Sequence, residues 1–346
     1  MKVIFIRVIA VTLCVITVFG LVALFLRRKD EENIPDVTQI ANSNPDGIKP
    51  DTVMITMNES YSATADEYFY HAMGMRNEYI KQYGAEVFDN NPLLIISILN
   101  EVDSILIDNA AYKLWGNEVG FELTEADLAD FEEQVEQLKA YLLESGTTFA
   151  THLKNNNLNE ELFRRVYLTN MYVNKFVSDY LMAELPNVEV TEEEIDTHLA
   201  EHAVYAAKHI LLNEETAEEY EMILTVADDI LARLDDGTDF DTLMFEMSKD
   251  PGLMENPNGY TFREGEFVPE FEAVTKELEI GEISGIVESE YGIHIIMRTE
   301  IDRETVKYWI QQEKMEQKRL EYEQRLNPVT TEVRNNLELL DMKPII

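Results

Sequence analysis

Cysteine is nearly absent from this 346-residue chain: Cys14 is the single one, and it stands in an apolar run near the amino terminus. An intrachain disulfide and a metal site built from several cysteines are therefore excluded. Basic residues are also few, with 28 Lys and Arg against 67 Asp and Glu and a formal net charge of −39. Because such a chain repels the phosphates of nucleic acids, the sequence predicts no nucleic-acid partner. The acidic excess is interpreted as a solvated surface, with attraction for basic or weakly charged polypeptides as the functional alternative.

The amino-terminal apolar run has the length of a membrane span. Residues 8–26 carry no charge and are flanked by Lys2 and Arg7 before and by the basic cluster 27–29 after. The run exceeds the apolar part of an ordinary cleaved signal peptide, and no small-x-small cleavage site follows it. We therefore expect residues 1–29 to form an uncleaved single-pass anchor. By the positive-inside rule, the basic cluster would hold the carboxyl side in the cytoplasm, so these residues alone leave the orientation open.

Turn-forming residues and then helical patterns follow the apolar run. Residues 30–50 are polar and predict a linker, and residues 52–57 predict a strand that Asn58 ends. From there to about residue 202 the pattern is helical, with apolar residues three and four apart. The helical signals are the run 93–115, a capping sequence at 124–127 and the run 159–182.

Helical signals also surround a central segment. Thr191–Glu194 predicts a capping box, and Thr216–Glu219 opens a second helix that Gly237 closes. Arg303–Leu326 predicts a charged helix, which Asn327-Pro328 breaks before a short helix from Thr330 to Leu340. The apolar stripe of the long helix is narrow, so that helix needs a partner to be buried. The stripe consists of Trp309, Ile310, Met315 and Leu320.

Two short apolar strands, each with one histidine, bracket the central segment. His209 lies in the run 208–212 and His294 in the run 291–296. Between them come, in order, Gly237–Phe240, Ser248–Asp250, Phe267–Phe271 and Gly281–Ser284. This order and spacing over about a hundred residues resembles the parvulin family of peptidyl-prolyl cis/trans isomerases, which carry a PpiC or rotamase domain. The resemblance implies an α+β fold, with a small antiparallel sheet surrounded by helices.

The resemblance also implies a site for twisting an X–Pro amide. The barrier to rotation is near 20 kcal/mol, yet no covalent bond breaks, so the site needs an apolar grip on the proline ring and polar groups that favour the twisted amide. The resemblance implies a back-to-back, hydrogen-bonded histidine pair beneath the substrate, a carboxylate facing the amide, two pocket walls and a rim. These residues are, in the same order, His209 with His294, Asp250, Phe267 with Phe271, and Tyr291. No cofactor and no metal is implied.

Each of these roles has a structural alternative. The two histidines could only hold two strands in register, and Asp250 could only cap the turn at Pro251-Gly252. The stretch Asn258–Phe262 also departs from the G-D-L-G-x-F sequence of many relatives, which predicts an altered lid over the pocket. The loop Asn213–Glu215 has no arginine cluster, so recognition of phosphorylated peptides is not expected.

A rival motif lies just before the first histidine strand. His198–His202 matches the H-x-x-E-H string of inverted zinc peptidases, and two histidines four residues apart share one helix face. The string stands in a glutamate-rich helix, and no downstream glutamate helix offers a third ligand. The zinc-peptidase interpretation is therefore the weaker one.

The complete prediction is a membrane-anchored foldase. Residues 51–200 are similar in pattern to the helical domain of SurA-like extracytoplasmic chaperones, 201–302 form the parvulin-type domain, and 303–346 return to pack on the helical domain. We expect a peptidyl-prolyl isomerase and chaperone for exported, unfolded polypeptides that contain X–Pro bonds. The resemblance places these domains outside the cell membrane. The alternative function is a non-catalytic holdase whose parvulin-like domain only binds peptides.

Overall fold

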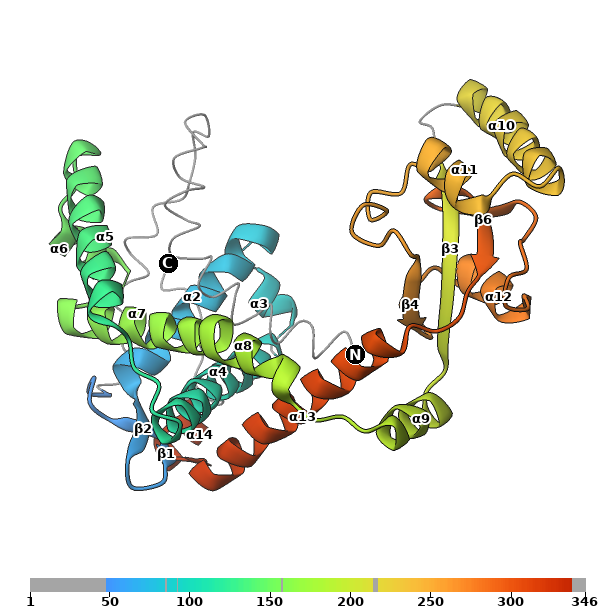
Figure 1. The fold of residues 1–346 in the computed structure, drawn as a ribbon. Coiled ribbons are helices and arrows are strands. Elements are labelled where there is room, and N and C mark those ends of the chain that lie inside the picture. The colour runs from blue at the N-terminus through green and yellow to red at the C-terminus, as the bar shows by residue number, and fades with distance from the viewer. Residues whose placement is uncertain (1–47, 85, 92, 157, 214–216, 338–346) are drawn as a thin grey trace. The chain divides into compact units, whose positions relative to one another are not determined.

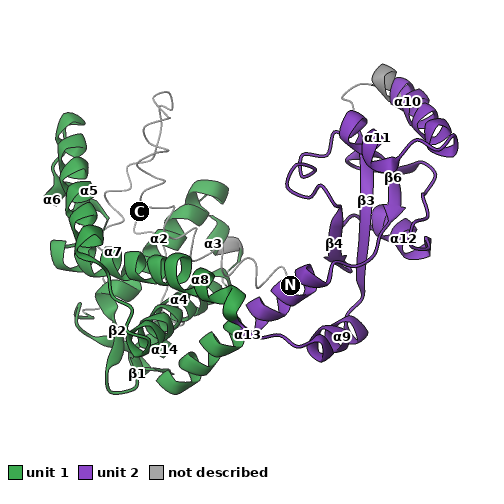
Figure 2. Cartoon of the chain, in the orientation of Figure 1, with its two compact units in different colours: residues 1–187, 315–346 green, residues 188–314 purple. Residues whose placement is uncertain are grey.

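The computed structural model describes residues 48–84, 86–91, 93–156, 158–213 and 217–337. The predicted anchor, almost all of the predicted linker, Thr216 and the end of the last predicted helix lie outside these residues. Within them, no helix is long and apolar enough to cross a membrane. The chain divides into two compact units, which are described separately: unit 1 comprises Met1–Asn187 and Met315–Ile346, and unit 2 comprises Val188–Lys314 (Figure 2).

Unit 1 contains a small antiparallel sheet of order β2-β1-β7. Its strands are β1 (Val53–Met57), β2 (Tyr61–Thr64) and β7 (Val329–Thr330). β1 was predicted, but the prediction of helix directly after it was wrong, and the helix predicted from Thr330 begins only at Glu332, because Thr330 belongs to β7. Asn58 adopts a positive φ of 50°, and its side-chain oxygen accepts a hydrogen bond from Ser60 N at 2.7 Å, so a tight turn returns the chain as β2. β7 forms only because β1, far away in sequence, offers it an edge.

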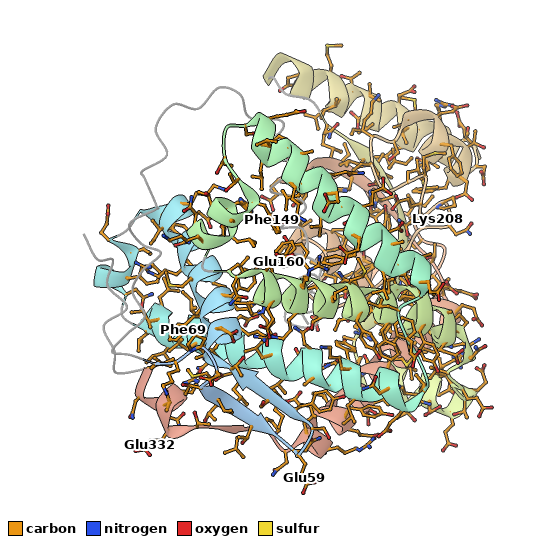
Figure 3. All side chains as sticks on the ribbon, turned by 90° about the vertical axis from the view of Figure 1, so that its left-hand side faces the viewer. Glu59, Phe69, Phe149, Glu160, Lys208 and Glu332 are labelled. Atoms are coloured by element: carbon orange, nitrogen blue, oxygen red, sulfur yellow. The ribbon has the colours of Figure 1, made fainter. Side chains whose placement is uncertain are left out.

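Helices make up most of unit 1 (Figure 1). They are α2 (Ala65–Tyr83), α3 (Val87–Asn90), α4 (Leu93–Glu118), α5 (Glu125–Glu144), α6 (Phe149–Asn155), α7 (Glu160–Lys175) and α8 (Met182–Glu184). A π-helical segment, Phe176–Leu181, joins α7 to α8, and a 3-10 turn, Leu185–Asn187, follows. The predicted cap of α5 is confirmed, because Thr124 and Asp127 exchange backbone and side-chain hydrogen bonds. Figure 3 shows Phe149 and Glu160, the residues that open α6 and α7.

The carboxyl-terminal part of the chain contributes to the core of unit 1. The predicted helix is confirmed as α13 (Arg303–Leu326), and α14 (Glu332–Leu337) follows. Within unit 1, Tyr322 stacks on Trp115 with ring centroids 5.3 Å apart, and Leu326 is fully buried. The predicted apolar stripe was wrong at Leu320, which is exposed, because the buried face at this end of α13 runs through Tyr322 and Leu326 instead.

Unit 2 is an antiparallel sheet of order β4-β3-β6-β5 with helices around it, and this confirms the predicted α+β fold (Figure 1). The strands are β3 (Val204–Leu212), β4 (Tyr260–Arg263), β5 (Val287–Ser289) and β6 (Gly292–Arg298). The helices are α9 (Glu192–Glu201), α10 (Ala217–Asp235), α11 (Phe240–Met247) and α12 (Pro269–Glu277). The predicted capping box at Thr191 opens α9, and Gly237 follows α10 with a φ of 93°.

Strand alternation places a separate apolar cluster against each face of the sheet of unit 2. Ile210 of β3, with Ile293 and Ile295 of β6, packs against residues of α10 and α11. The alternate residues of these two strands face the other side of the sheet, because successive strand side chains point to opposite faces. Ala207 and Ile296 accordingly pack with Phe271 of α12. The α12 face of the sheet is also the face of His209 and His294.

Candidate functional site

The two predicted histidines meet on the central strands of unit 2. His209 on β3 is paired in register with Ile296, and His294 on β6 is paired with Leu211, so the histidines lie diagonally across the two strands. Their ring centroids are 5.4 Å apart and their planes make an angle of 73°. The structure therefore brings the two residues together, as expected from neighbouring strands.

The prediction that the two histidines form a hydrogen bond with each other was wrong. Within the described chain, neither ring nitrogen of His209 has a hydrogen-bond partner, and the Nδ1 atom of His294 has none. The Nε2 atom of His294 instead lies 2.7 Å from the hydroxyl oxygen of Ser289 on β5. The diagonal register turns an edge of one ring toward a face of the other, so the nitrogens do not point at each other.

Burial keeps both imidazoles neutral. His209 is 6% exposed and His294 is 5% exposed. Because a charge is disfavoured away from water, burial lowers the pKa of His294 to about 4, with a smaller contribution from His209. Burial also lowers the pKa of His209, although the nearby Asp250 carboxylate opposes that shift. At neutral pH the site thus presents two uncharged rings.

Asp250 joins a turn to the histidine site. Its Oδ1 atom accepts a hydrogen bond from Gly252 N at 3.0 Å, so the predicted turn-capping alternative is confirmed. Its Oδ2 atom accepts one from the Tyr260 hydroxyl at 2.6 Å and lies 3.6 Å from His209 Nε2. One carboxylate therefore both shapes the turn and sets the charge beside His209.

The loop that carries Asp250 is fixed to β3. Leu211 N donates to the Ser248 hydroxyl oxygen at 3.1 Å, and Lys249 N donates to the Leu211 carbonyl at 2.7 Å. These bonds lie immediately before Asp250 in the chain. They explain how a loop residue holds a defined position beside a strand residue.

Aromatic side chains fill the space between the histidines and α12. Phe271 stacks on Phe267 with centroids 5.0 Å apart and makes edge contacts with His209 at 5.3 Å and His294 at 5.6 Å. Phe271 is 0% exposed, so the expectation that it forms an open pocket wall was wrong. The first turn of α12 presses this ring onto the sheet, and Phe267, which is partly buried, is the member of the pair that reaches the surface.

Tyr291 lies between β5 and β6 and is 60% exposed. Its backbone N donates to the Ser289 hydroxyl oxygen at 3.1 Å. Since that hydroxyl also contacts His294, the turn is connected to the histidine site through Ser289. The role of Tyr291 at the pocket rim remains a prediction.

Three further residues of the site, Tyr260, Phe262 and Ser289, were not predicted from the sequence. Tyr260 is nearly parallel to His209, with centroids 5.7 Å apart and 12° between the planes, and Phe262 packs on Phe267 at 4.5 Å. Both residues lie in the stretch whose departure from the family motif was interpreted as an altered lid. Their two-residue spacing, which places them on one face of β4, was the signal that could have found them.

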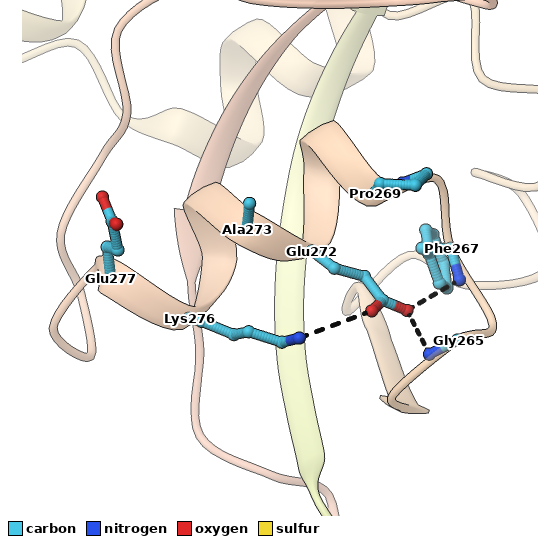
Figure 4. A pocket seen from close by; sticks show the side chains of 7 residues that line it. All are labelled: Gly265, Phe267, Pro269, Glu272, Ala273, Lys276 and Glu277. Atoms are coloured by element: carbon cyan, nitrogen blue, oxygen red, sulfur yellow. Dashed lines mark hydrogen bonds and ion pairs between the residues drawn. The ribbon is translucent and has the colours of Figure 1, made fainter.

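A shallow hollow runs along the outer side of α12 next to this cluster (Figure 4). It is lined by Gly265, Phe267, Pro269, Glu272, Ala273, Lys276 and Glu277. The buried Glu272 carboxylate accepts hydrogen bonds from Gly265 N at 2.7 Å and Phe267 N at 3.1 Å and lies 3.7 Å from Lys276 Nζ. These hydrogen bonds to Glu272 therefore stabilise the turn that contains Phe267.

The two histidines of the rival zinc-peptidase motif contact protein side chains. The rings of His198 and His202 stack with centroids 4.2 Å apart, and His198 Nε2 lies 3.3 Å from the Arg263 guanidinium. A neighbouring guanidinium opposes a bound cation. Across the described parts of the chain, no three or more His, Cys, Asp or Glu side chains are grouped so that they could hold a metal ion.

Comparison with known proteins identifies the segment that carries the site. Residues 175–301 match the family model described as the PPIC-type PPIASE domain. The chain is 39% identical over 140 residues to the foldase protein PrsA of Halalkalibacterium halodurans, covering 36% of this chain and 39% of that protein. It is 33% identical over 183 residues to the foldase protein PrsA of Oceanobacillus iheyensis, covering 52% of this chain and 54% of that protein.

The curated relatives and the solved structures differ in coverage. The matched regions span about two fifths of the first relative and about half of the second. A crystal structure of PrsA from Bacillus subtilis is 18% identical, with a TM-score of 0.33, and the match covers 81% of this chain and 93% of that one.

Proposed function

We propose that this chain, which carries a PPIC-type PPIase domain within residues 175–301, is a membrane-anchored peptidyl-prolyl cis/trans isomerase and foldase. The observation that carries the proposal is the match of this domain to the segment that holds the two neutral histidines. Its substrates are unfolded or partly folded exported polypeptides with X–Pro bonds. The similarity to proteins named foldase supports the folding role.

The site suits a reaction that needs no covalent chemistry. The partial double bond of the X–Pro amide weakens as the amide twists, so catalysis requires only that the twisted form be bound better than the planar forms. In this proposal Phe267 contacts the proline ring and Tyr291 borders it. Phe271 supports Phe267 from the core and holds the two histidines in place.

Asp250 supplies the polar side of the proposed site. Its carboxylate lies 3.6 Å from His209 and is held by Gly252 and Tyr260, so its orientation is fixed before a peptide binds. A fixed charge or dipole costs no reorganisation when the amide twists. His209 and His294 line the floor beneath the peptide as uncharged rings. No cofactor takes part in this mechanism.

The proposal also assigns a role to each of the other regions of the chain. Residues 51–200 with 303–346 act as the chaperone body, and 201–302 as the isomerase domain. Residues 1–29 anchor the chain in the cell membrane through one helix, 30–50 link this anchor to the body, and the folded units stand outside the membrane. Protease added to intact cells should then digest the units while the anchor stays in the membrane fraction. Protection until lysis would reverse the orientation.

A protease-coupled assay with a proline-containing peptide tests the enzymatic proposal on the full chain in detergent. We expect acceleration of cis/trans exchange and a loss of roughly tenfold or more in kcat/KM for Asp250→Asn and Phe267→Ala. Phe245→Ala, at an exposed position of α11, is the matched control and should keep the activity. Suppression of client aggregation without isomerisation would favour the holdase alternative.

A further inference from the structure

Tyr260 contacts two residues of the proposed site, His209 and Asp250. It is paired in register with Ala207 of β3, which places its ring on the α12 face of the sheet, beside the ring of His209. Its hydroxyl donates a 2.6 Å hydrogen bond to Oδ2 of Asp250. One side chain thus contacts both the imidazole and the carboxylate of the proposed site.

The Tyr260 hydroxyl donates its hydrogen bond to the Asp250 carboxylate oxygen that faces His209. Oδ2 of Asp250 is 3.6 Å from His209 Nε2, which is beyond hydrogen-bond length. Oδ1 is taken by Gly252 N. Both carboxylate oxygens therefore have a donor other than the imidazole, and within the described chain both nitrogens of His209 are left without a hydrogen bond.

The neighbouring turn makes room for this hydroxyl. A Cβ atom added at Gly252 would lie 2.3 Å from the Tyr260 hydroxyl oxygen and 3.5 Å from Asp250 Oδ1. Any side chain at this position would therefore displace the tyrosine or the turn. A glycine at the point of closest approach shows that turn and tyrosine fit each other.

We propose that Tyr260 is a positioning residue of the isomerase site, whose hydroxyl holds the Asp250 carboxylate and prevents it from forming a hydrogen bond with His209. This inference rests on the proposed isomerase function for its kinetic consequence, but not for its effect on His209. Tyr260 lies in the stretch that departs from the family motif, so the departure adds a polar contact to the site.

The charges around His209 make the proposal testable by pH. Asp250 faces it from the loop after α11, His294 from β6 and Tyr260 from β4, while α12 contributes the apolar Phe271. Without the hydroxyl, Oδ2 loses its donor, and the nearest replacement is the Nε2–H of a protonated His209. The imidazolium form is then stabilised, since an opposite charge favours the charged form.

Tyr260→Phe isolates the hydroxyl because it keeps the ring beside His209. Tyr205→Phe is the matched control: this residue is on β3, its ring contacts Phe262, and its hydroxyl has no hydrogen bond among those found in the described chain. The full chain, labelled with ¹³C at its six histidines, would be titrated by NMR in detergent. His209→Gln identifies the signal of His209.

We expect Tyr260→Phe to raise the titration midpoint of His209 by roughly one pH unit. The acid limb of the pH profile of kcat/KM should move to higher pH with it. Tyr205→Phe should change neither. A purely structural role for Tyr260 would lower stability without moving the His209 midpoint.

The outcomes separate this inference from the proposed function. An identical His209 midpoint in the parent and Tyr260→Phe overturns the positioning role, whatever the activity. A raised His209 midpoint in Tyr260→Phe, together with a parent chain that does not isomerise proline peptides, supports the contact between Tyr260 and Asp250 and contradicts the isomerase proposal. A raised midpoint together with a shifted acid limb supports both.

Discussion

His209 and His294 meet edge to face on neighbouring strands, with ring centroids 5.4 Å apart, and exchange no hydrogen bond. Both imidazoles are therefore held by packing against each other and against Phe271, and His294 has in addition its contact with the Ser289 hydroxyl. Removal of one ring leaves a gap but does not deprive the other ring of a hydrogen-bond partner.

The histidine pair should show weak energetic coupling. In a double-mutant cycle of His209→Leu and His294→Leu, we expect a coupling energy of about 0.5–1.5 kcal/mol, the scale of an aromatic edge contact. A hydrogen-bonded pair would instead leave an orphaned partner, at about 1–3 kcal/mol. Urea unfolding at pH 7.5 measures the cycle. A coupling energy above about 2 kcal/mol would contradict the edge-to-face arrangement.

Phe271→Ala should destabilise unit 2 strongly. The side chain is fully buried between α12 and the sheet, so its removal leaves a cavity and should cost about 3–5 kcal/mol. Phe245→Ala is the control, because that ring is 53% exposed and should cost less than about 1 kcal/mol. Chemical unfolding followed by circular dichroism compares the two. Equal losses would place Phe271 outside the core.

Acid should destabilise both units over a defined range of pH. Burial lowers the pKa of His71 in unit 1 and of His294 in unit 2 to about 4. Between the ordinary value near 6.5 and pH 4, the unfolded chain binds more protons than the folded chain. The contribution of each neutral histidine is thus complete above about pH 6.5 and is lost as the pH falls toward 4.

The test removes one histidine from each unit. We expect each to account for about 1–3 kcal/mol of the acid loss, so His71→Leu and His294→Leu should each flatten the stability profile between pH 6.5 and 4. Trp115 reports on unit 1 and Trp309 on unit 2, so fluorescence of the single-tryptophan variants Trp309→Phe and Trp115→Phe follows each unit separately. Unchanged slopes would contradict the assignment.

Arg334 should be essential for the stability of unit 1. It is 2% exposed and donates to Asp103 at 2.5 Å and to Asn100 at 2.9 Å, so α14 is joined to α4 by a buried ion pair. Arg334→Ala leaves the carboxylate without this partner and should cost about 3–5 kcal/mol.

The control for Arg334 is a surface ion pair of the same chemistry. Arg325 pairs with Glu118, and both side chains are substantially exposed. Because water screens such a pair, Arg325→Ala should cost less than about 1 kcal/mol. Thermal or urea unfolding of the two variants gives the comparison. Similar losses would mean that the burial of Arg334 does not matter.

The sequence by itself determined the local elements, and its resemblance to the parvulin family implied that the two histidine strands are neighbours. The caps at Thr124 and Thr191 and the ends of α13 depend on groups within a few residues, so the pattern contains the whole interaction. The apolar runs around His209 and His294 likewise identified β3 and β6, whose neighbourhood the structure confirms.

Tertiary structure decided how side chains are buried and oriented. The diagonal register of β3 and β6 replaced the expected histidine hydrogen bond with an edge contact, and the docking of α12 buried Phe271. The contact between Tyr260 and Asp250 arises because β4 and the loop after α11 meet at β3. Local signals extend over a few residues, whereas these contacts depend on the register and packing of distant segments, which no local pattern encodes.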